Sequence, residues 1–378
     1  PPRSTLFPYT TLFRSHLLTF YHPSNLNRDD LNRPKTAQVG GSLRLRVSSQ
    51  SLKRAWRTSD IFNQFGEDVG KGDRGLRTRD FRALVFTPLK DGGMEPMQAA
   101  AWADKIMDIF KKKSEAQDKK EKDKEKKSKS LDTKDRFDFG HMLFLSSQEK
   151  AAISNVVTAL LNQQVPSDED LAKALQKTNT AVDLAMFGRM LADKPDFNVE
   201  AAVQVAHAFT VGAAVVEDDF FTAVDDLNAG IEDVGAGHMG EVEFGSGVFY
   251  LYVCVDCALL RENLSGRPDL AGPALAALTE AAATVAPTGK QNSFASRAYA
   301  QYVLAEKGDR QPRSLATAFV QPVTGTDQVA AAIAQLRKTR ADMDQVYGAL
   351  ADAQEELSVP DRDGSLAKVL DFVAEACS

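Results

Sequence analysis

Residues 43–57 read Leu-Arg-Leu-Arg-Val-Ser-Ser-Gln-Ser-Leu-Lys-Arg-Ala-Trp-Arg. The first five residues alternate apolar and basic side chains, a pattern typical of a β-strand. It predicts Leu43, Leu45 and Val47 on one face of the strand and both arginines on the other. Either of the next two serines has the side-chain oxygen that caps a helix. The stretch therefore predicts a strand that leads directly into a helix.

The predicted helix carries its cations together. Lys53 and Arg57 are four residues apart and share a face, and Arg54 lies beside them. Leu52 and Trp56 are predicted to point elsewhere, toward the interior.

Basic charge is concentrated in residues 25–57, although the chain as a whole is acidic. This stretch has eight Lys and Arg against two acids, whereas the net charge of the chain is -6. A polyanion responds to the nearby field, which decays over about 8–10 Å at physiological salt. Strand arginines, cap hydroxyls, amides at the helix start and helix cations together predict a phosphate-binding site. The alternative is a solvated basic helix face.

The composition is that of an ordinary globular protein with one elaborate domain or two smaller ones. The chain has 378 residues, of which 43% are hydrophobic and 26% charged. No apolar run approaches the roughly 18 residues of a membrane span. We therefore expect a cytoplasmic protein without membrane partners.

The three cysteines are few and odd in number, which argues against a disulfide framework. Cys254 and Cys257 have CxxC spacing, but they lie in an apolar stretch that reads as a buried strand. No second CxxC exists to complete a zinc site. We expect both cysteines to be buried for packing, and the sequence predicts no metal and no cofactor.

Residues 1–15 lack an initiator methionine and contain Thr-Leu-Phe twice. They are interpreted as an artefact of sequence assembly and left out of the fold prediction. Residues 16–20 are then the remainder of an N-terminal strand.

Apolar segments predict strands at 16–20, 43–47, 242–260 and 294–303, with a further one at 315–323. Helical periodicity occurs at 97–110, 148–161 and 168–191. Strands from both ends of the chain must pair around this helical stretch, which predicts an α+β fold with inserted helices. Residues 111–136 contain twelve Lys and Arg and seven acids. Such a segment cannot bury much surface, so a flexible loop or frayed helix is predicted there.

The opposite charge pattern occurs at residues 217–243, which contain nine acids and no Lys or Arg. Asp225 and Asp226 with His238 would suggest a metal or acid–base site, but the two acids are adjacent rather than staggered to converge. An extended hairpin arm with Phe220 and Phe221 exposed is favoured. Such aromatics dock a partner or stack on a base.

Several blocks of sequence resemble one family. They are Asn25-Leu-Asn-Arg-Asp-Asp30, Gly40-Gly41, Arg46-Val-Ser-Ser-Gln-Ser-Leu-Lys-Arg-Ala55, Gly188-Arg-Met190, Phe221-Thr-Ala-Val-Asp-Asp-Leu227, His238, Phe244-Gly-Ser-Gly-Val-Phe-Tyr250 and Gly289-Lys-Gln291. In this order they resemble the CasC backbone subunits of type I-E CRISPR Cascade complexes, members of the RAMP superfamily.

The resemblance implies a right-hand-like α+β fold. Its parts are a ferredoxin-like (RRM-like) palm, an inserted helical fingers region and a protruding β-hairpin thumb. The expected boundaries are 16–65 for the first part of the palm, 66–198 for the fingers, 199–241 for the thumb arm, and 242–378 for the second part of the palm with C-terminal helices.

The resemblance also implies site residues. Those expected to hold the phosphate backbone of a CRISPR RNA are Arg28, Lys35, Ser48, Gln50, Lys53, Arg54, Arg57 and Lys290. Those expected to wedge against bases are Met190, Phe220, Phe221 and Met239. For Met190, ordinary helix core is the alternative.

The partners implied are CRISPR RNA, further copies of the same chain arranged head to tail, other Cascade subunits, and target DNA through the guide. No catalysis by this subunit is implied. The alternative is an RNA-cleaving subunit of the type III kind that uses Asp29 or Asp30. A filament protein that needs no nucleic acid is a second alternative.

Overall fold

The computed structural model describes residues 11–63, 74–111, 136–176, 180–191, 193–223, 238–265 and 267–377. The chain divides into two compact units. Unit 1 consists of Pro1–Phe62, Val203–Ala258 and Gly272–Ser378, and unit 2 of Asn63–Ala202 and Leu259–Ala271. All but the two end residues of the charged segment 111–136 lie outside the described residues.

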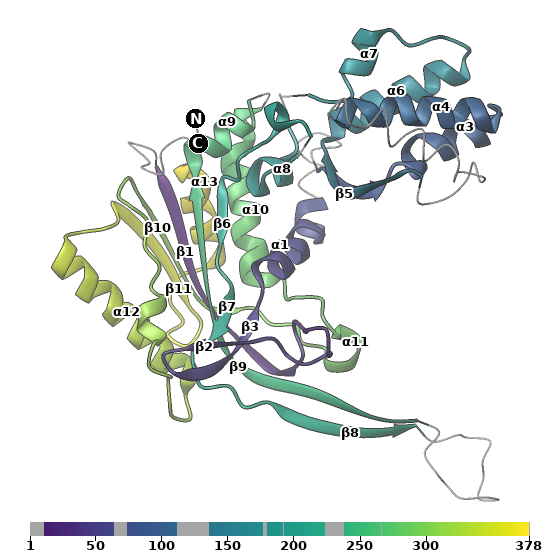
Figure 1. The fold of residues 1–378 in the computed structure, drawn as a ribbon. Coiled ribbons are helices and arrows are strands. Elements are labelled where there is room, and N and C mark those ends of the chain that lie inside the picture. The colour runs from purple at the N-terminus through teal and green to yellow at the C-terminus, as the bar shows by residue number, and fades with distance from the viewer. Residues whose placement is uncertain are drawn as a thin grey trace, which may run out of the picture. The chain divides into compact units, whose positions relative to one another are not determined.

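Unit 1 is built on an antiparallel sheet (Figure 1). Across the sheet the strands are β11 (Ala353–Ser358), β10 (Ala300–Gly308), β1 (Leu12–Ser24), β9 (His238–Asp256), β7 (Ala208–Thr210), β3 (Ser42–Val47) and β2 (Thr36–Val39). Two further strands, β6 (Val203–Val205) and β8 (Glu217–Ala223), also pair with β9. Strands from the two ends of the chain therefore lie side by side, as predicted.

Helices cover both faces of this sheet. The helical elements of unit 1 are α1 (Ser49–Arg57), α10 (Ala271–Thr284), α11 (Gln291–Phe294), the 3-10 turn η5 (Ala316–Phe319), α12 (Gln328–Tyr347) and α13 (Leu366–Ala376). Leu18 and Tyr302 pack with Leu336 of α12 on one face. Their strand neighbours Leu17 and Val303 point to the opposite face and are also buried.

Unit 2 combines a two-stranded sheet with short helices. Its elements are β4 (Leu76–Asp80), the π-helical turn η1 (Arg82–Phe86), α3 (Thr87–Asp91), α4 (Pro96–Met107), η2 (Asp108–Phe110), β5 (Asp138–Leu145), α6 (Ser147–Leu161), α7 (Asp168–Ala172), α8 (Val182–Phe187), η3 (Pro195–Phe197) and η4 (Pro268–Leu270). Helix α9 (Cys257–Asn263) crosses the boundary between the units. Phenylalanine side chains such as Phe81, Phe110 and Phe137 fill the core.

The predicted α+β class with inserted helices is confirmed. The strands predicted at 16–20 and 43–47 lie in β1 and β3, and the helices predicted at 97–110 and 148–161 correspond to α4 with η2 and to α6. The helical stretch predicted at 168–191 is instead split into the short helices α7 and α8.

The strand predicted at 315–323 is wrong. Part of this run forms η5, and Leu315, its N-cap, and Ala318 are buried three residues apart as in a helical turn. The run lies against the sheet and is not one of its strands. Two other predictions had the wrong ends, because β9 stops at Asp256 before α9 and β10 begins only at Ala300.

Leaving out residues 1–15 was wrong for Leu12–Ser15, which form the beginning of β1 and are buried. Arg14 lies 3.8 Å from the carboxylate of Glu306 on β10, and both side chains are fully buried. Arg313 pairs with the same carboxylate through two hydrogen bonds of 2.7 and 2.9 Å. Glu306 thus holds two cations of the palm.

Two cysteines are bonded to each other, which the sequence argument did not anticipate. Cys257 and Cys377 form a disulfide across a sequence separation of 120 residues. Cys254 is buried and unbonded, and Cys257 is buried at the start of α9, so the expected burial of both is confirmed.

Glu306→Gln should lower the free energy of unfolding by about 3–5 kcal/mol, because the buried Arg14 and the half-buried Arg313 lose their carboxylate. Burial alone would raise the pKa of Glu306, but hydrogen bonds from His16 and Arg313 hold it well below its ordinary value of 4.5. A depressed folded-state pKa means that the stabilisation is complete above about pH 4.5 and is lost as the pH falls toward the folded-state value. Urea denaturation at neutral and acidic pH measures both effects.

The control is Glu375→Gln on the exposed side of α13, which should change stability by less than about 0.5 kcal/mol. Equal losses in the two variants at neutral pH would contradict the role of Glu306. A difference in free energy of unfolding between wild type and Glu306→Gln that stays constant as the pH falls would also contradict it.

Candidate nucleic-acid interface

Hydrogen bonds fasten the loop before β2 to the start of α1. The side-chain oxygen of Asn27 accepts from the backbone N–H of Ser48 at 2.9 Å. The Lys35 N–H donates to the Asn27 carbonyl at 2.8 Å. Arg28 forms a β-bridge with Pro34, which closes the loop. Arg28 and Lys35 therefore lie at the two ends of a closed loop that is attached to the first turn of α1.

Asp29 holds this loop in shape. Its Oδ1 accepts from the backbone N–H groups of Leu31 and Arg33, both at 2.9 Å. This is the local turn that an aspartate commonly makes with its own backbone. Asp30 is exposed.

Helix α1 presents polar side chains beside the loop. Ser48 is its N-cap, and the Oγ of Ser48 accepts from the Ser51 N–H at 3.3 Å. Gln50 and Arg54 are exposed, and Lys53 is half-buried. The helix has no acidic residue in its first turn, so nothing there opposes an anion.

Arg57, another predicted phosphate contact on this helix, is placed differently from the prediction. Leu52 and Trp56 are buried as expected, but Arg57 is buried with them and only 8% exposed. It does not share an open face with Lys53. The reason is that the last turn of α1 is covered on more than one side, which the spacing of the cations does not reveal.

The two arginines of β3, Arg44 and Arg46, lie in different environments. Arg44 is fully buried, and its guanidinium donates to the backbone carbonyls of Thr210, Val211 and Phe319. Its charge is therefore used to join β3 to η5 and to the chain after β7, and the prediction that it faces a polyanion is wrong. Arg46 remains partly exposed at the end of β3.

A histidine that the sequence argument missed lies beside Arg46. The Nδ1 atom of His207, between β6 and β7, is 3.1 Å from the Ser49 backbone nitrogen and 3.2 Å from Nη1 of Arg46. Burial, and then the charges of Arg46 and Lys35, lower the pKa of His207. His207 belongs to no motif, so only the folded chain places it at the start of α1.

Lys290 lies close to the same loop. A Cβ atom added to Gly289 would lie 2.3 Å from the Leu26 carbonyl oxygen, so the two backbone segments touch and only glycine fits. Lys290 follows with a left-handed backbone, φ 46°, and is half-buried. The structure thus brings together Arg28, Lys35, Ser48, Gln50, Lys53, Arg54 and Lys290. We call this set, with Arg46, the basic seat.

The predicted hairpin arm is formed by β8 and the first part of β9 (Figure 1). Phe220 is 60% and Phe221 40% exposed, but adjacent strand residues point to opposite faces. The Phe221 ring lies over Gly240 of β9. Met239 is in β9 opposite Thr222, and its side chain lies outside the described part of the structure. Residues 224–237, including Asp225 and Asp226, also lie outside it.

In unit 2, Met190 is 78% exposed and follows helix α8, so it is not ordinary helix core. Its neighbour Arg189 is buried and pairs with Glu149 at 2.7 Å. Glu149 also accepts from the backbone N–H of Ser146 in the capping box of α6. Gly188 has a left-handed backbone, φ 76°, and a Cβ atom added there would collide with neighbouring backbone atoms. The Gly188–Met190 motif therefore anchors a loop and exposes its methionine.

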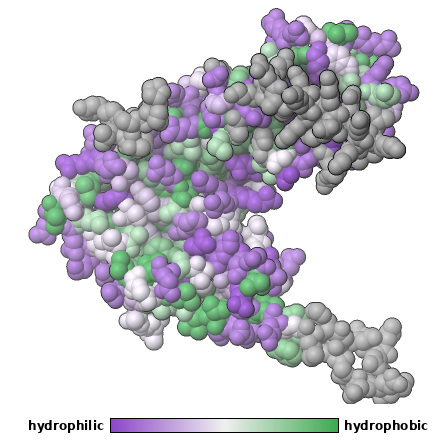
Figure 2. Space-filling view, in the orientation of Figure 1, coloured by the Kyte–Doolittle hydropathy of each residue, from purple (hydrophilic) through white to green (hydrophobic). Residues whose placement is uncertain are grey.

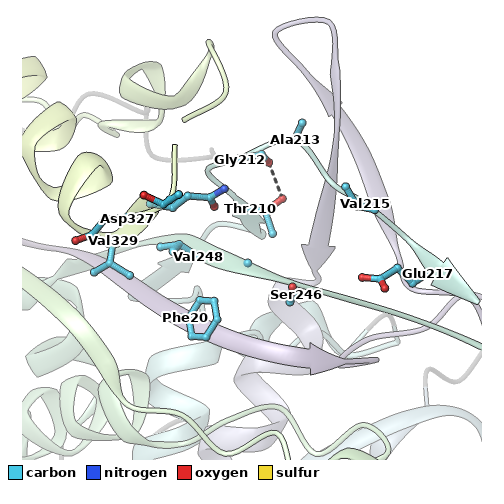
Figure 3. A pocket seen from close by; sticks show the side chains of 13 residues that line it. Phe20, Thr210, Gly212, Ala213, Val215, Glu217, Ser246, Val248, Asp327 and Val329 are labelled. Atoms are coloured by element: carbon cyan, nitrogen blue, oxygen red, sulfur yellow. Dashed lines mark hydrogen bonds between the residues drawn. The ribbon is translucent and has the colours of Figure 1, made fainter. Parts of the chain in front are cut away.

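A cavity of about 440 Å³ opens in unit 1 near the base of the hairpin (Figure 3). Phe20, Val215, Glu217 and Asp327 are among its lining residues, and none of the basic seat lines it. Figure 2 shows hydrophobic residues gathered near this place, where the hairpin leaves the sheet. The carboxylates make this cavity a poor place for phosphate.

Among the described residues, no three His, Cys, Asp or Glu side chains are grouped so as to hold a metal ion. Within the same residues, no helix has the length and apolarity needed to cross a membrane.

Cations that suit phosphates, together with exposed aromatics that suit bases, are features typical of proteins that bind single-stranded nucleic acid without reading its sequence. The fold that carries them is α+β with an RRM-like palm.

The chain belongs to the family of CT1975-like proteins (Cas_CT1975), whose sequence profile matches residues 14–372. No curated protein matches it. A solved structure titled "CRISPR RNA-guided surveillance complex, pre-nicking" contains a similar chain with 28% identity and a TM-score of 0.79. A second, "CRISPR RNA-guided surveillance complex", contains one with 26% identity and a TM-score of 0.60. Each match covers 97% of this chain and 100% of the other.

Arg44→Met should destabilise the fold by at least about 3 kcal/mol, because three buried carbonyls lose their donor at about 1–3 kcal/mol each. Lys35→Met is the matched control and should change stability by less than about 0.5 kcal/mol. The midpoint of urea denaturation measures both. Similar midpoints for the two variants would show that Arg44 does not join these segments.

Proposed function

We propose that this protein is a CRISPR RNA-binding backbone subunit of a Cascade surveillance complex, of the type I-E CasC kind. The observation that carries the proposal is the basic seat at the start of α1. The similarity to chains of RNA-guided surveillance complexes supports it. In this role the seat holds guide RNA by its phosphates.

The chemistry of the seat suits a guide of arbitrary sequence. A protein that presents such a guide cannot depend on hydrogen bonds to particular base edges, because base pairing must remain available to the target. Cations and polar side chains contact phosphates, which carry no sequence information. Arg28 and Lys35 on the loop and Gln50, Lys53 and Arg54 on α1 would provide these contacts.

The exposed apolar side chains are proposed to separate bases. Phe221, Phe220 and Met239 on the hairpin and Met190 in unit 2 would wedge against the guide, so that bases are kinked out at intervals and the remainder stay readable. Base–aromatic stacking tolerates any sequence, because every base has a π-face. Since Phe220 and Phe221 are on opposite hairpin faces, they would contact different neighbours.

The proposed assembly is a row of copies head to tail along the guide, with other Cascade subunits, in the cytoplasm. An open helical row follows when an interface joins two different surfaces of the same chain. The acidic strand β8, with Glu217, Asp218 and Asp219, and the basic seat are surfaces of opposite charge on one chain. Target DNA would be bound through base pairing with the guide.

Lys35→Ala and Lys53→Ala should each weaken RNA binding equally for poly(U) and poly(A), because phosphates are the same in both. Each variant should also make the slope of log affinity against log salt shallower by about 0.7, the value for one phosphate contact on a single strand. Lys338→Ala on α12 is the control cation and should leave the slope unchanged. Fluorescence anisotropy across a salt series is the measurement, and a loss confined to one of the two RNAs would refute a sequence-blind seat.

The subunit is proposed to be non-catalytic. The Asp29 Oδ1 atom is engaged by two backbone N–H groups. The alternative, RNA cleavage with Asp29 or Asp30, requires activity that depends on one of these residues. Incubation of the assembled complex with complementary RNA and Mg²⁺ should leave the RNA intact; regular cuts that disappear in Asp30→Ala or Asp29→Asn would establish the alternative.

A further inference from the structure

His207 lies beside the basic seat and outside the sequence blocks that resemble the family. Its Nδ1 atom receives two donors, the backbone N–H of Ser49 at 3.1 Å and Nη1 of Arg46 at 3.2 Å. An arginine can only donate, and a backbone nitrogen can only donate. The Nδ1 atom must therefore be the acceptor and carries no proton.

This arrangement determines the state of the other ring nitrogen. A neutral imidazole with an unprotonated Nδ1 carries its hydrogen on Nε2. The residue is exposed, and within the part of the chain that the structure describes Nε2 has no hydrogen-bond partner. The Nε2–H group is thus a fixed donor at the surface of the seat.

The surroundings keep the ring neutral and attract an anion. Partial desolvation of the ring, and then the positive charges of Arg46 and Lys35, lower the pKa of His207, which favours its neutral form. The same two cations, and the positive end of the α1 dipole, favour a phosphate beside the ring. A neutral donor between cations can bind a phosphate oxygen without adding to the repulsion among them.

We propose that His207 is a further phosphate-contacting residue of the guide site, donating its Nε2–H to a backbone oxygen of the RNA as a neutral imidazole. This inference rests on the proposed function. It assigns to His207 a contact that differs from those of the lysines and arginines, because the imidazole donates a directional hydrogen bond but carries no charge.

Two substitutions separate the contact from simple positioning of α1. In His207→Asn the amide oxygen stands about where Nδ1 was, so Ser49 and Arg46 keep their acceptor while the outward donor is lost. In His207→Gln the amide N–H stands about where Nε2 was, so the outward donor is kept. Affinity for fluorescein-labelled poly(U) is measured for the full chain across a salt series, with Lys35→Ala in parallel.

His207→Asn should weaken binding roughly tenfold, which corresponds to about 1.4 kcal/mol. His207→Gln should stay within about threefold of wild type, and neither variant should change the salt slope, because no charge is removed. ¹⁵N spectra of the imidazole should show the proton on Nε2 before and after RNA is added.

Wild-type affinity in His207→Asn would overturn the proposal, and so would an equal loss in both variants. A shallower salt slope in His207→Asn, or an imidazolium in the RNA complex, would show a cationic contact instead of a neutral one. If Lys35→Ala also binds RNA as tightly as wild type, the basic seat is not the RNA-binding site, and the proposed function fails together with the inference. If only Lys35→Ala weakens binding, the function stands and the role of His207 does not.

Discussion

The palm and the hairpin arm share one strand, and this covalent continuity constrains everything around it. β9 runs from His238 to Asp256 and pairs with β1, β6, β7 and β8 along its length. Its pleat fixes which side chains enter the core and which remain outside on the arm. Because β7 in turn pairs with β3, the start of α1 and the basic seat are positioned from the same strand.

Positive charge in this chain serves two purposes that the sequence does not separate. Arg44 and Arg46 are two residues apart on the same strand and were predicted to act alike. Arg44 is surrounded by carbonyl groups from residues that lie 166 to 275 positions away, and it becomes part of the core. Arg46 contacts His207 and is partly exposed to solvent. The basic residues of one stretch thus serve two roles. Some bind carbonyl groups in the core, and others remain at the surface.

Local pattern predicted the elements whose stabilising contacts are also local. The strand at 43–47, the Ser48 cap and the buried Leu52 and Trp56 of α1 follow from neighbouring residues, and the structure reproduces them. The predicted facing fails at the start of the strand, where Leu43 is exposed and Arg44 is buried. The fate of Arg57, the helical form of residues 316–319 and the Cys257–Cys377 bond depend on partners far away in the sequence. His207 was missed for the same reason, since a lone histidine has no spacing to recognise.

In the hairpin, the face on which each aromatic ring lies depends on whether the number of strand residues before it is odd or even. Phe221 lies over Gly240, whereas Phe220 projects from the other side of the ribbon. Adding or removing one residue between Glu217 and Phe220 would exchange the sides of the two rings, and a two-residue change would restore them. A change in parity would therefore turn the arm's aromatic surfaces over without altering its composition.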